Sequence, residues 1–78
     1  MNLREFIMNF LNVSTVVNIY SRERDYDLDT PVHLEYGDTV ELLLKNKQFA
    51  NLLDGKVEYV AASFRNIQPI MDIHISME

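Results

Sequence analysis

The sequence predicts an α+β domain, a two-layer sandwich in which two helices cover one face of a four-stranded, mostly antiparallel sheet. Two segments place apolar residues at helical spacing, and four short segments are rich in β-formers and alternate between apolar and polar residues. Along the chain the order is α-β-β-α-β-β, so a helix precedes each of two hairpins. The 78 residues show neither an internal linker nor a residue-level repeat, so we expect one domain over residues 1–78.

The first helix is predicted by an apolar stripe at i, i+3, i+4, i+7 and i+8, formed by Leu3, Phe6, Ile7, Phe10 and Leu11. Asn2 is a favourable N-cap, and Glu5 completes a capping box. We expect the stripes of both helices to meet the sheet in one core. Its predicted members are Phe6, Phe10, Leu43, Phe49, Leu52, Ile73 and Ile75.

The middle of the chain predicts two strands, a loop and a second helical region. Thr15–Tyr20 and Val32–Tyr36 are β-branched and alternating, and the polar loop 21–30 joins them as an antiparallel hairpin. Asp38 is the expected N-cap of the next helix, with Glu41 at the capping-box position. This helix either continues to about Leu53 or divides into two short helices near Asn46. Asp54 and Gly55 are its expected stop, with Gly55 in the left-handed conformation.

Two more strands end the chain. The segment Ile70–Met77 alternates cleanly, and Arg65–Pro69 forms the preceding turn. The segment Lys56–Phe64 is apolar on both of its faces, one with Val57, Tyr59 and Ala61 and the other with Val60, Ala62 and Phe64. We expect the second face to lie on the bare side of the sheet, where Val60 and Phe64 would contact a partner.

Charge is concentrated in the middle of the sequence. The chain carries 12 acidic and 7 basic residues, a formal net charge of −5, and residues 21–41 alone hold seven acids against two bases. A solvated loop with helix-cap acids is the simplest interpretation. The alternative is an acidic surface that meets a basic partner. The candidate partner-binding residues are Glu23, Asp25, Asp27, Asp29, Glu35, Val60 and Phe64.

Two patterns could be mistaken for metal sites. Asp25, Asp27 and Asp29 have the spacing that begins an EF-hand loop, but the loop continues with Thr30 and Tyr36 where a glycine and a glutamate are required. A weak cation site remains the alternative there. His33, His74 and Asp72 could form a two-histidine, one-carboxylate set if their strands were neighbours, although an exposed strand histidine is usually surface. We therefore predict no metal and no cofactor.

The sequence favours a binding protein over an enzyme. None of its serines lies in a glycine-flanked strand–turn–helix elbow, its two glycines cannot form a phosphate-binding loop, and it has no cysteine. We expect no catalytic residue. Strong acidity disfavours direct nucleic-acid binding, and no apolar run is long enough to span a membrane. We expect a soluble, cytoplasmic protein with a protein partner, and a homodimer with Phe64 in or near its interface.

The chain resembles a group of short uncharacterised proteins encoded in phages and prophages of gut and related bacteria. The resemblance rests on an N-terminal helix, a strand, a helix start and a final alternating strand, here residues 3–7 (LREFI), 15–20 (TVVNIY), 37–43 (GDTVELL) and 71–78 (MDIHISME). A longer and more acidic middle loop is where this chain departs from the group. The resemblance implies a phage or prophage accessory protein and transfers no catalytic residue.

Overall fold

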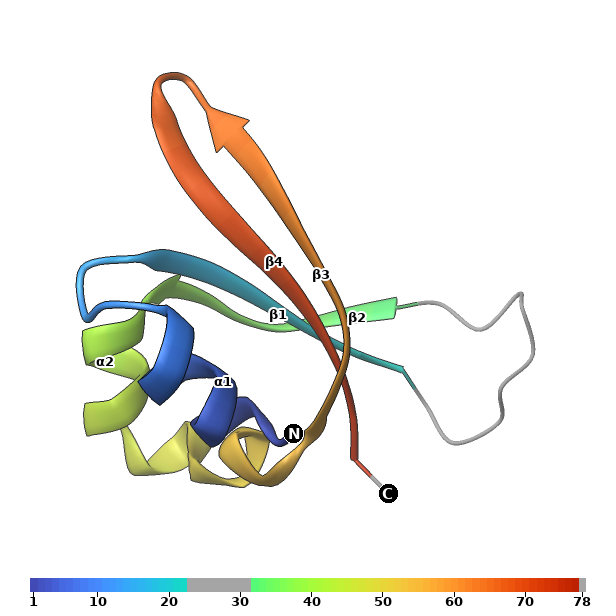
Figure 1. Cartoon of the computed structure of the whole chain (residues 1–78). Helices are drawn as coiled ribbons and strands as arrows, with labels where there is room; N and C mark the ends of the chain where they lie inside the picture. Colours follow the sequence, from blue (N-terminus) through green and yellow to red (C-terminus); the bar gives the residue numbers. More distant parts are fainter. Residues whose placement is uncertain (23–31, 78) are drawn as a thin grey trace.

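The computed structural model describes residues 1–22 and 32–77 and shows one α+β unit (Figure 1). The elements are α1 (Leu3–Phe10), β1 (Val16–Arg22), β2 (Val32–Thr39), α2 (Val40–Lys45), the 3₁₀ helix η1 (Lys47–Asp54), β3 (Lys56–Arg65) and β4 (Gln68–Ser76). The predicted order of helices and strands is therefore confirmed, with the second helical region in two pieces. No helix of the described part is long and apolar enough to cross a membrane.

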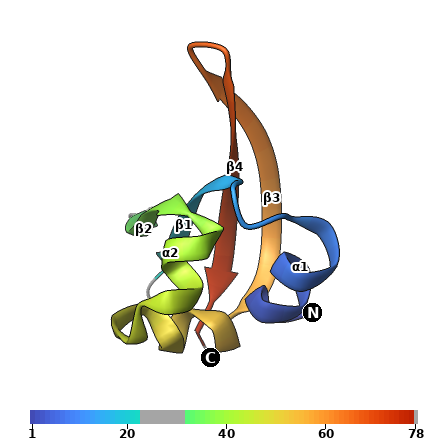
Figure 2. The ribbon, with the colours of Figure 1, turned by 90° about the vertical axis from the view of Figure 1, so that its left-hand side faces the viewer.

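The four strands form one mixed sheet with the order β2-β1-β4-β3. Both hairpins, β1–β2 and β3–β4, are antiparallel as expected. The central pair, β1 and β4, is parallel, which local sequence patterns did not predict. The β3–β4 hairpin is long, and its turn lies far from the helices (Figures 1 and 2). The turn itself is shorter than expected, and Asn66 adopts a φ of 59° in it.

Three helical segments cover one face of the sheet because each contributes side chains to the same core. The helical segments contribute two residues each: Leu3 and Ile7 from α1, Val40 and Leu43 from α2, and Leu52 and Leu53 from η1. These side chains pack against residues of β1, β2 and β4, which are Val17, Ile19, Tyr36, Ile73 and Ile75. Of the predicted core residues, Leu43, Leu52, Ile73 and Ile75 are buried, and Phe6 and Phe49 are partly buried against them. The prediction that Phe10 lies in the core is wrong, because Phe10 is 65% exposed.

Local capping explains where the helices begin. The predicted box of α1 is present: the Glu5 backbone N–H donates to Asn2 Oδ1 at 2.8 Å, and the Asn2 N–H donates to Glu5 at 3.3 Å. At α2 the N-cap is Thr39 rather than Asp38: the Leu42 backbone N–H donates to Thr39 Oγ1 at 3.4 Å, and Thr39 is also the last residue of β2. Asn46 ends α2 and caps η1 with its side chain, so the two-helix alternative is confirmed.

Gly55 ends η1 for a steric reason. Its φ of −66° is open to any residue, so the expected left-handed conformation is wrong. A Cβ atom at this position would lie 2.7 Å from Ile75 Cδ1 and 2.8 Å from Met77 Sδ. The Gly55 carbonyl also accepts a hydrogen bond from the Leu3 N–H at 2.8 Å. The glycine therefore lets the end of η1 approach β4 and the start of α1 closely.

A bulge in β3 corrects the predicted faces of that strand. Val57 pairs with Ile75 but Tyr59 pairs with His74, so Glu58 is an extra residue. Paired residues point to the same face, so Val57, Val60, Ala62 and Phe64 lie on the helix side and Tyr59, Ala61 and Ser63 on the other. The expectation that Val60, Ala62 and Phe64 lie on the bare face is wrong.

Candidate functional site

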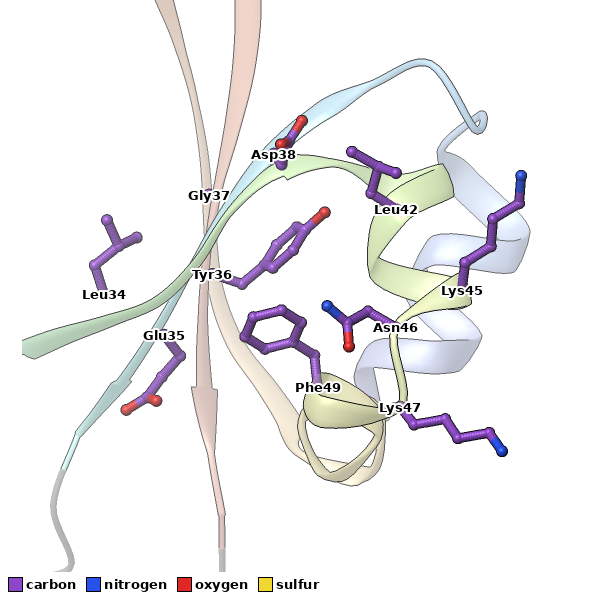
Figure 3. Close-up of a pocket in the computed structure, with 10 residues that line it drawn as sticks. All are labelled: Leu34, Glu35, Tyr36, Gly37, Asp38, Leu42, Lys45, Asn46, Lys47 and Phe49. Carbon is purple, nitrogen blue, oxygen red and sulfur yellow. The ribbon is translucent and has the colours of Figure 1, made fainter.

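A groove of about 670 Å³ lies between β2 and the α2–η1 corner. Figure 3 shows its walls: one is the strand, and the other is formed by α2 and the start of η1. The lining residues are Leu34, Glu35, Tyr36, Gly37, Asp38, Leu42, Lys45, Asn46, Lys47 and Phe49. Because β2 is an edge strand of the sheet, the groove runs beside a strand that pairs on one side only. We call it the β2 groove.

Aromatic and aliphatic side chains form the apolar part of the β2 groove. The rings of Tyr36 and Phe49 lie side by side in Figure 3, with centroids 4.8 Å apart in an edge-to-face arrangement. Tyr36 is buried, and its hydroxyl donates to the Thr39 carbonyl at 2.6 Å. Leu34 and Leu42 remain 57% and 50% exposed, although both line the groove. The groove therefore offers apolar surface over a fixed aromatic pair.

Charges of both signs surround this apolar surface. Lys45 Nζ lies 2.9 Å from Glu41 Oε1, and Figure 3 shows the side chains of Lys45 and Lys47 extended away from the rings. On the strand side, Glu35 accepts a hydrogen bond from Ser21 Oγ at 2.7 Å. Burial raises the pKa of the Tyr36 hydroxyl above its ordinary value, and the negative charge of Asp38 raises this pKa further. Among the residues that line the groove, Lys45 and Lys47 lie on the helical wall, and Glu35 and Asp38 lie on the strand wall.

The helix-free face of the sheet carries two cross-strand rows. In one row, His74 of β4 lies between Tyr20 of β1 and Tyr59 of β3, with ring centroids 4.9 Å and 5.4 Å away. In the next row, Asp72 accepts hydrogen bonds from Asn18 Nδ2 at 3.0 Å and from Ser63 Oγ at 3.2 Å. Strand pairing thus places aromatic and polar side chains together on a face that the helices leave open.

Gly37 makes room for the second row. Gly37 is the β2 partner of Asn18, and a Cβ on Gly37 would lie 3.0 Å from Asn18 Oδ1. The missing side chain lets the Asn18 amide lie beside β2 while its Nδ2 group reaches Asp72.

The predicted acidic residues are only partly placed. Glu23, Asp25, Asp27 and Asp29 lie outside the described residues, and so does the candidate cation site that they form. Glu35 is exposed and lines the β2 groove. It is therefore the one member of the predicted acidic set that the structure connects to a cavity among the described residues.

The predicted apolar contact residues, Val60 and Phe64, do not share one environment. Val60 is half-buried and packs against the core, whereas Phe64 is 73% exposed in the part of β3 near the hairpin turn. Ile67, in that turn, is 97% exposed. The structure therefore leaves Phe64, but not Val60, available for a contact.

The two-histidine set is not formed. His74 pairs with Tyr20 and His33 pairs with Ser21, so the two histidines lie on opposite faces of the sheet. Within residues 1–22 and 32–77, no group of three or more His, Asp or Glu side chains could hold a metal ion. The alternative in which His33 and His74 approach each other is therefore wrong.

Sequence reasoning missed both the β2 groove and the aromatic row. The groove depends on how α2 and η1 turn at Asn46, which no local pattern specifies. The aromatic row was missed because the sequence pattern puts Tyr59 on the same face as Val57. Recognising the bulge at Glu58 would have been the signal that unites Tyr59 with His74.

Comparisons with protein-family models, with curated proteins and with solved structures gave no match to this chain.

Proposed function

We propose that this is a non-enzymatic binding protein that acts by protein–protein contact and takes an extended segment of a partner protein into the β2 groove. The observation that carries the proposal is the position of the groove, which follows an edge strand and is lined by apolar side chains. An edge strand presents backbone N–H and C=O groups that a second extended chain can pair with. The groove would then receive a side chain of that segment.

The two parts of the site divide the recognition between them. Backbone pairing along β2 would give affinity that depends little on sequence, because every extended peptide offers the same groups. The apolar surface of Leu34, Leu42 and Phe49 would select an aliphatic or aromatic side chain. Lys47 on the helical wall favours an acidic residue next to this apolar side chain.

A peptide selection tests this proposal even though the partner is unidentified. Random peptides selected on the immobilised protein should share an apolar residue, and a selected peptide should shift and protect the backbone amides of β2 in NMR spectra. Leu42→Glu places a charge in the groove and should weaken binding at least about tenfold.

Leu44→Glu is the matched control, since Leu44 is on the same helix, is also exposed and does not line the groove. It should bind the selected peptide as the unmodified protein does. Equal loss in both variants, or peptides that map to another surface, would contradict the proposal.

The biological setting is also proposed. The resemblance described above supports a phage or prophage accessory protein, and the acidic, cysteine-free composition supports a cytoplasmic location. The genes beside the coding sequence test this setting. Phage structural, replicative or anti-defence genes would support it, and housekeeping genes of a bacterial chromosome would contradict it.

The concentration of charge supports a second candidate function, an acidic inhibitor or nucleic-acid mimic that acts on a host protein through residues 21–41. This stretch carries a formal charge of −5, which equals that of the whole chain. A mimic of this kind should bind a basic host nuclease with an affinity that falls steeply with salt. Binding that is insensitive to salt would contradict this function and favour the β2 groove.

A further inference from the structure

β3 is the second edge strand of the sheet (Figure 1), and most of its outer edge is open in the described part of the chain. The N-terminal residues cover only the start of this edge, where Asn2 forms an antiparallel bridge with Lys56. From Tyr59 to Arg65, β3 pairs with β4 alone among the described residues. We call this stretch, residues 59–65, the β3 free edge.

The backbone groups of the β3 free edge can be assigned to its two sides. The Val57 N–H points outward, since it donates to the Met1 carbonyl at 3.0 Å. In a strand, residues whose side chains share a face direct their N–H and C=O groups to the same side. Across the bulge, Val60, Ala62 and Phe64 share the helix-side face with Val57, so their backbone groups also point outward. They are therefore available to pair with a further strand.

The β3 free edge lacks the features that usually prevent strand edges from pairing, which are charges, prolines, bulges and covering segments. Residues 59–64 (YVAASF) carry no charge and no proline, and their pairing with β4 is regular. β2, the other edge strand, is interrupted by a bulge at Glu35. Of the two edges, β3 therefore offers the longer regular stretch.

We propose that the β3 free edges of two copies of this chain pair antiparallel across a two-fold axis at Ala62, so that the two sheets become one. Ala62 is the midpoint of residues 59–65, and its backbone groups point outward. A shift of the register in either direction leaves part of the edge unpaired. A shift toward the start of β3 also brings the second copy against the N-terminal residues that already pair there. A symmetric contact of this kind closes at two copies.

The side chains of the β3 free edge complement one another in this register. Val60 of one copy lies opposite Phe64 of the other, so a phenyl ring that is 73% exposed in the single chain packs beside an aliphatic side chain. At the axis, Ala62 faces its own copy, and both side chains are small. The one charged residue, Arg65, lies opposite Tyr59, so no like charges face each other and a cation lies beside an aromatic ring.

Cysteine cross-linking tests the register directly, because the chain has no cysteine of its own. Ala62→Cys places two thiols at the axis, where the Cα atoms of paired residues are about 5.5 Å apart, a separation that a disulfide can span. With oxidised glutathione, this variant should form a disulfide-linked dimer at least about tenfold faster than Ala50→Cys at the same protein concentration. Ala50 is the matched control, an exposed alanine of η1. Equal rates would overturn the proposal.

A proline at the axis tests the backbone pairing. Ala62→Pro removes an N–H that points away from β4, so the β3–β4 hairpin should still form, and circular dichroism checks this. In sedimentation equilibrium this variant should be a monomer, whereas Ala62→Ser keeps the N–H and a small side chain and should be a dimer. A dimeric Ala62→Pro variant would overturn the proposal, and so would an unmodified protein that is monomeric at roughly tens of micromolar.

Amide exchange gives a readout that needs no variant. In the unmodified protein, the amides of Val60, Ala62 and Phe64 should exchange at least about tenfold more slowly in a concentrated than in a dilute sample, because they are paired only in the dimer. The amides of Ala61 and Ser63 point toward β4 in both states, so their exchange should change less. If the three outward amides exchange at a rate that is independent of concentration, the proposal is wrong.

This inference does not rest on the β2 groove, which lies beside the opposite edge of the sheet. Leu42→Glu should lose the groove peptide and remain a dimer. Conversely, Ala62→Pro should become a monomer and still bind the groove peptide. The failure of either proposal is therefore visible while the other still stands.

Discussion

Ile7 and Phe10 lie one turn apart on α1 but in different surroundings. Ile7 is 2% exposed and belongs to the core cluster, whereas Phe10 projects outward and contacts the ring of Phe6 at a centroid distance of 5.3 Å. We expect Ile7→Ala to lower the free energy of unfolding by about 2–5 kcal/mol, since it removes buried methyl groups and leaves a cavity. Phe10→Ala should cost less than about 1 kcal/mol. Urea unfolding measures both.

One result of comparing Ile7→Ala with Phe10→Ala would contradict the described orientation of α1. If Phe10→Ala proves as costly as Ile7→Ala, α1 is rotated about its axis relative to the arrangement described here. The reason that sequence alone misplaced Phe10 is geometric. A stripe of five apolar residues is wider than the strip of a short helix that a small sheet can cover, and local spacing does not say which edge of the stripe is left outside.

At the scale of elements, the junction of β2 and α2 depends on Tyr36. The ring packs on Phe49 of η1, and the hydroxyl binds the carbonyl of Thr39, the N-cap of α2. Because the pKa of Tyr36 is raised, the folded state keeps the phenolic proton to higher pH than the unfolded chain does. The stability from this group is complete below the ordinary tyrosine pKa of about 10 and is lost as the pH rises through the folded-state pKa.

We therefore expect Tyr36→Phe to be less stable than the unmodified protein by about 1 kcal/mol at neutral pH, through loss of the hydrogen bond. The difference should narrow as the pH rises above about 10, because the phenylalanine variant has no proton to lose at this position. Chemical unfolding of both proteins at a series of pH values measures this difference in the free energy of unfolding. Asp38→Asn removes the negative charge that raises the Tyr36 pKa, so in that background the difference should narrow at a lower pH. A gap that widens with pH would show that the Tyr36 pKa is lowered instead.

Element types followed from the sequence more readily than element ends. The capping box of α1 and the break at Asn46 were predictable, since each depends on residues within one turn of the chain. The N-cap of α2 was misplaced because Asp38 and Thr39 are both good caps. The Leu42 N–H donates to Thr39 Oγ1, whereas the Asp38 carboxylate accepts from the Thr39 N–H, and local sequence does not distinguish these two arrangements. The bulge at Glu58 was missed because it is defined by β4, not by β3 itself.

At the scale of the whole molecule, the β3–β4 hairpin reaches beyond the helices (Figure 2). Two of its side chains, Phe64 and Ile67, are exposed. We expect two copies to cover these side chains in a symmetric homodimer, which leaves the β2 groove outside the interface. Sedimentation equilibrium should give a dimer at roughly tens of micromolar for the unmodified protein and a monomer for Phe64→Glu. Phe10→Glu is the control, since Phe10 is an exposed phenylalanine on α1, and it should remain dimeric.

A monomeric unmodified protein at that concentration would contradict the dimer and leave the hairpin for a foreign partner. The contact face was assigned to the wrong side of the sheet from sequence, although Phe64 itself is exposed. Val60 is half-buried and Phe64 is exposed because the helices cover only part of the β3–β4 hairpin. The sequence of a strand does not show how far along it the helices extend.

The parallel pair at the centre of the sheet has a consequence for how the chain folds. Each hairpin joins neighbouring segments, but the contact of Asn18 with Asp72 joins positions 54 residues apart. Closing so long a loop costs chain entropy before any contact is gained, and proteins rich in such contacts fold slowly for their size. The hairpins and helices can form early and separately. We therefore expect the search that brings β4 alongside β1 to limit the rate of folding.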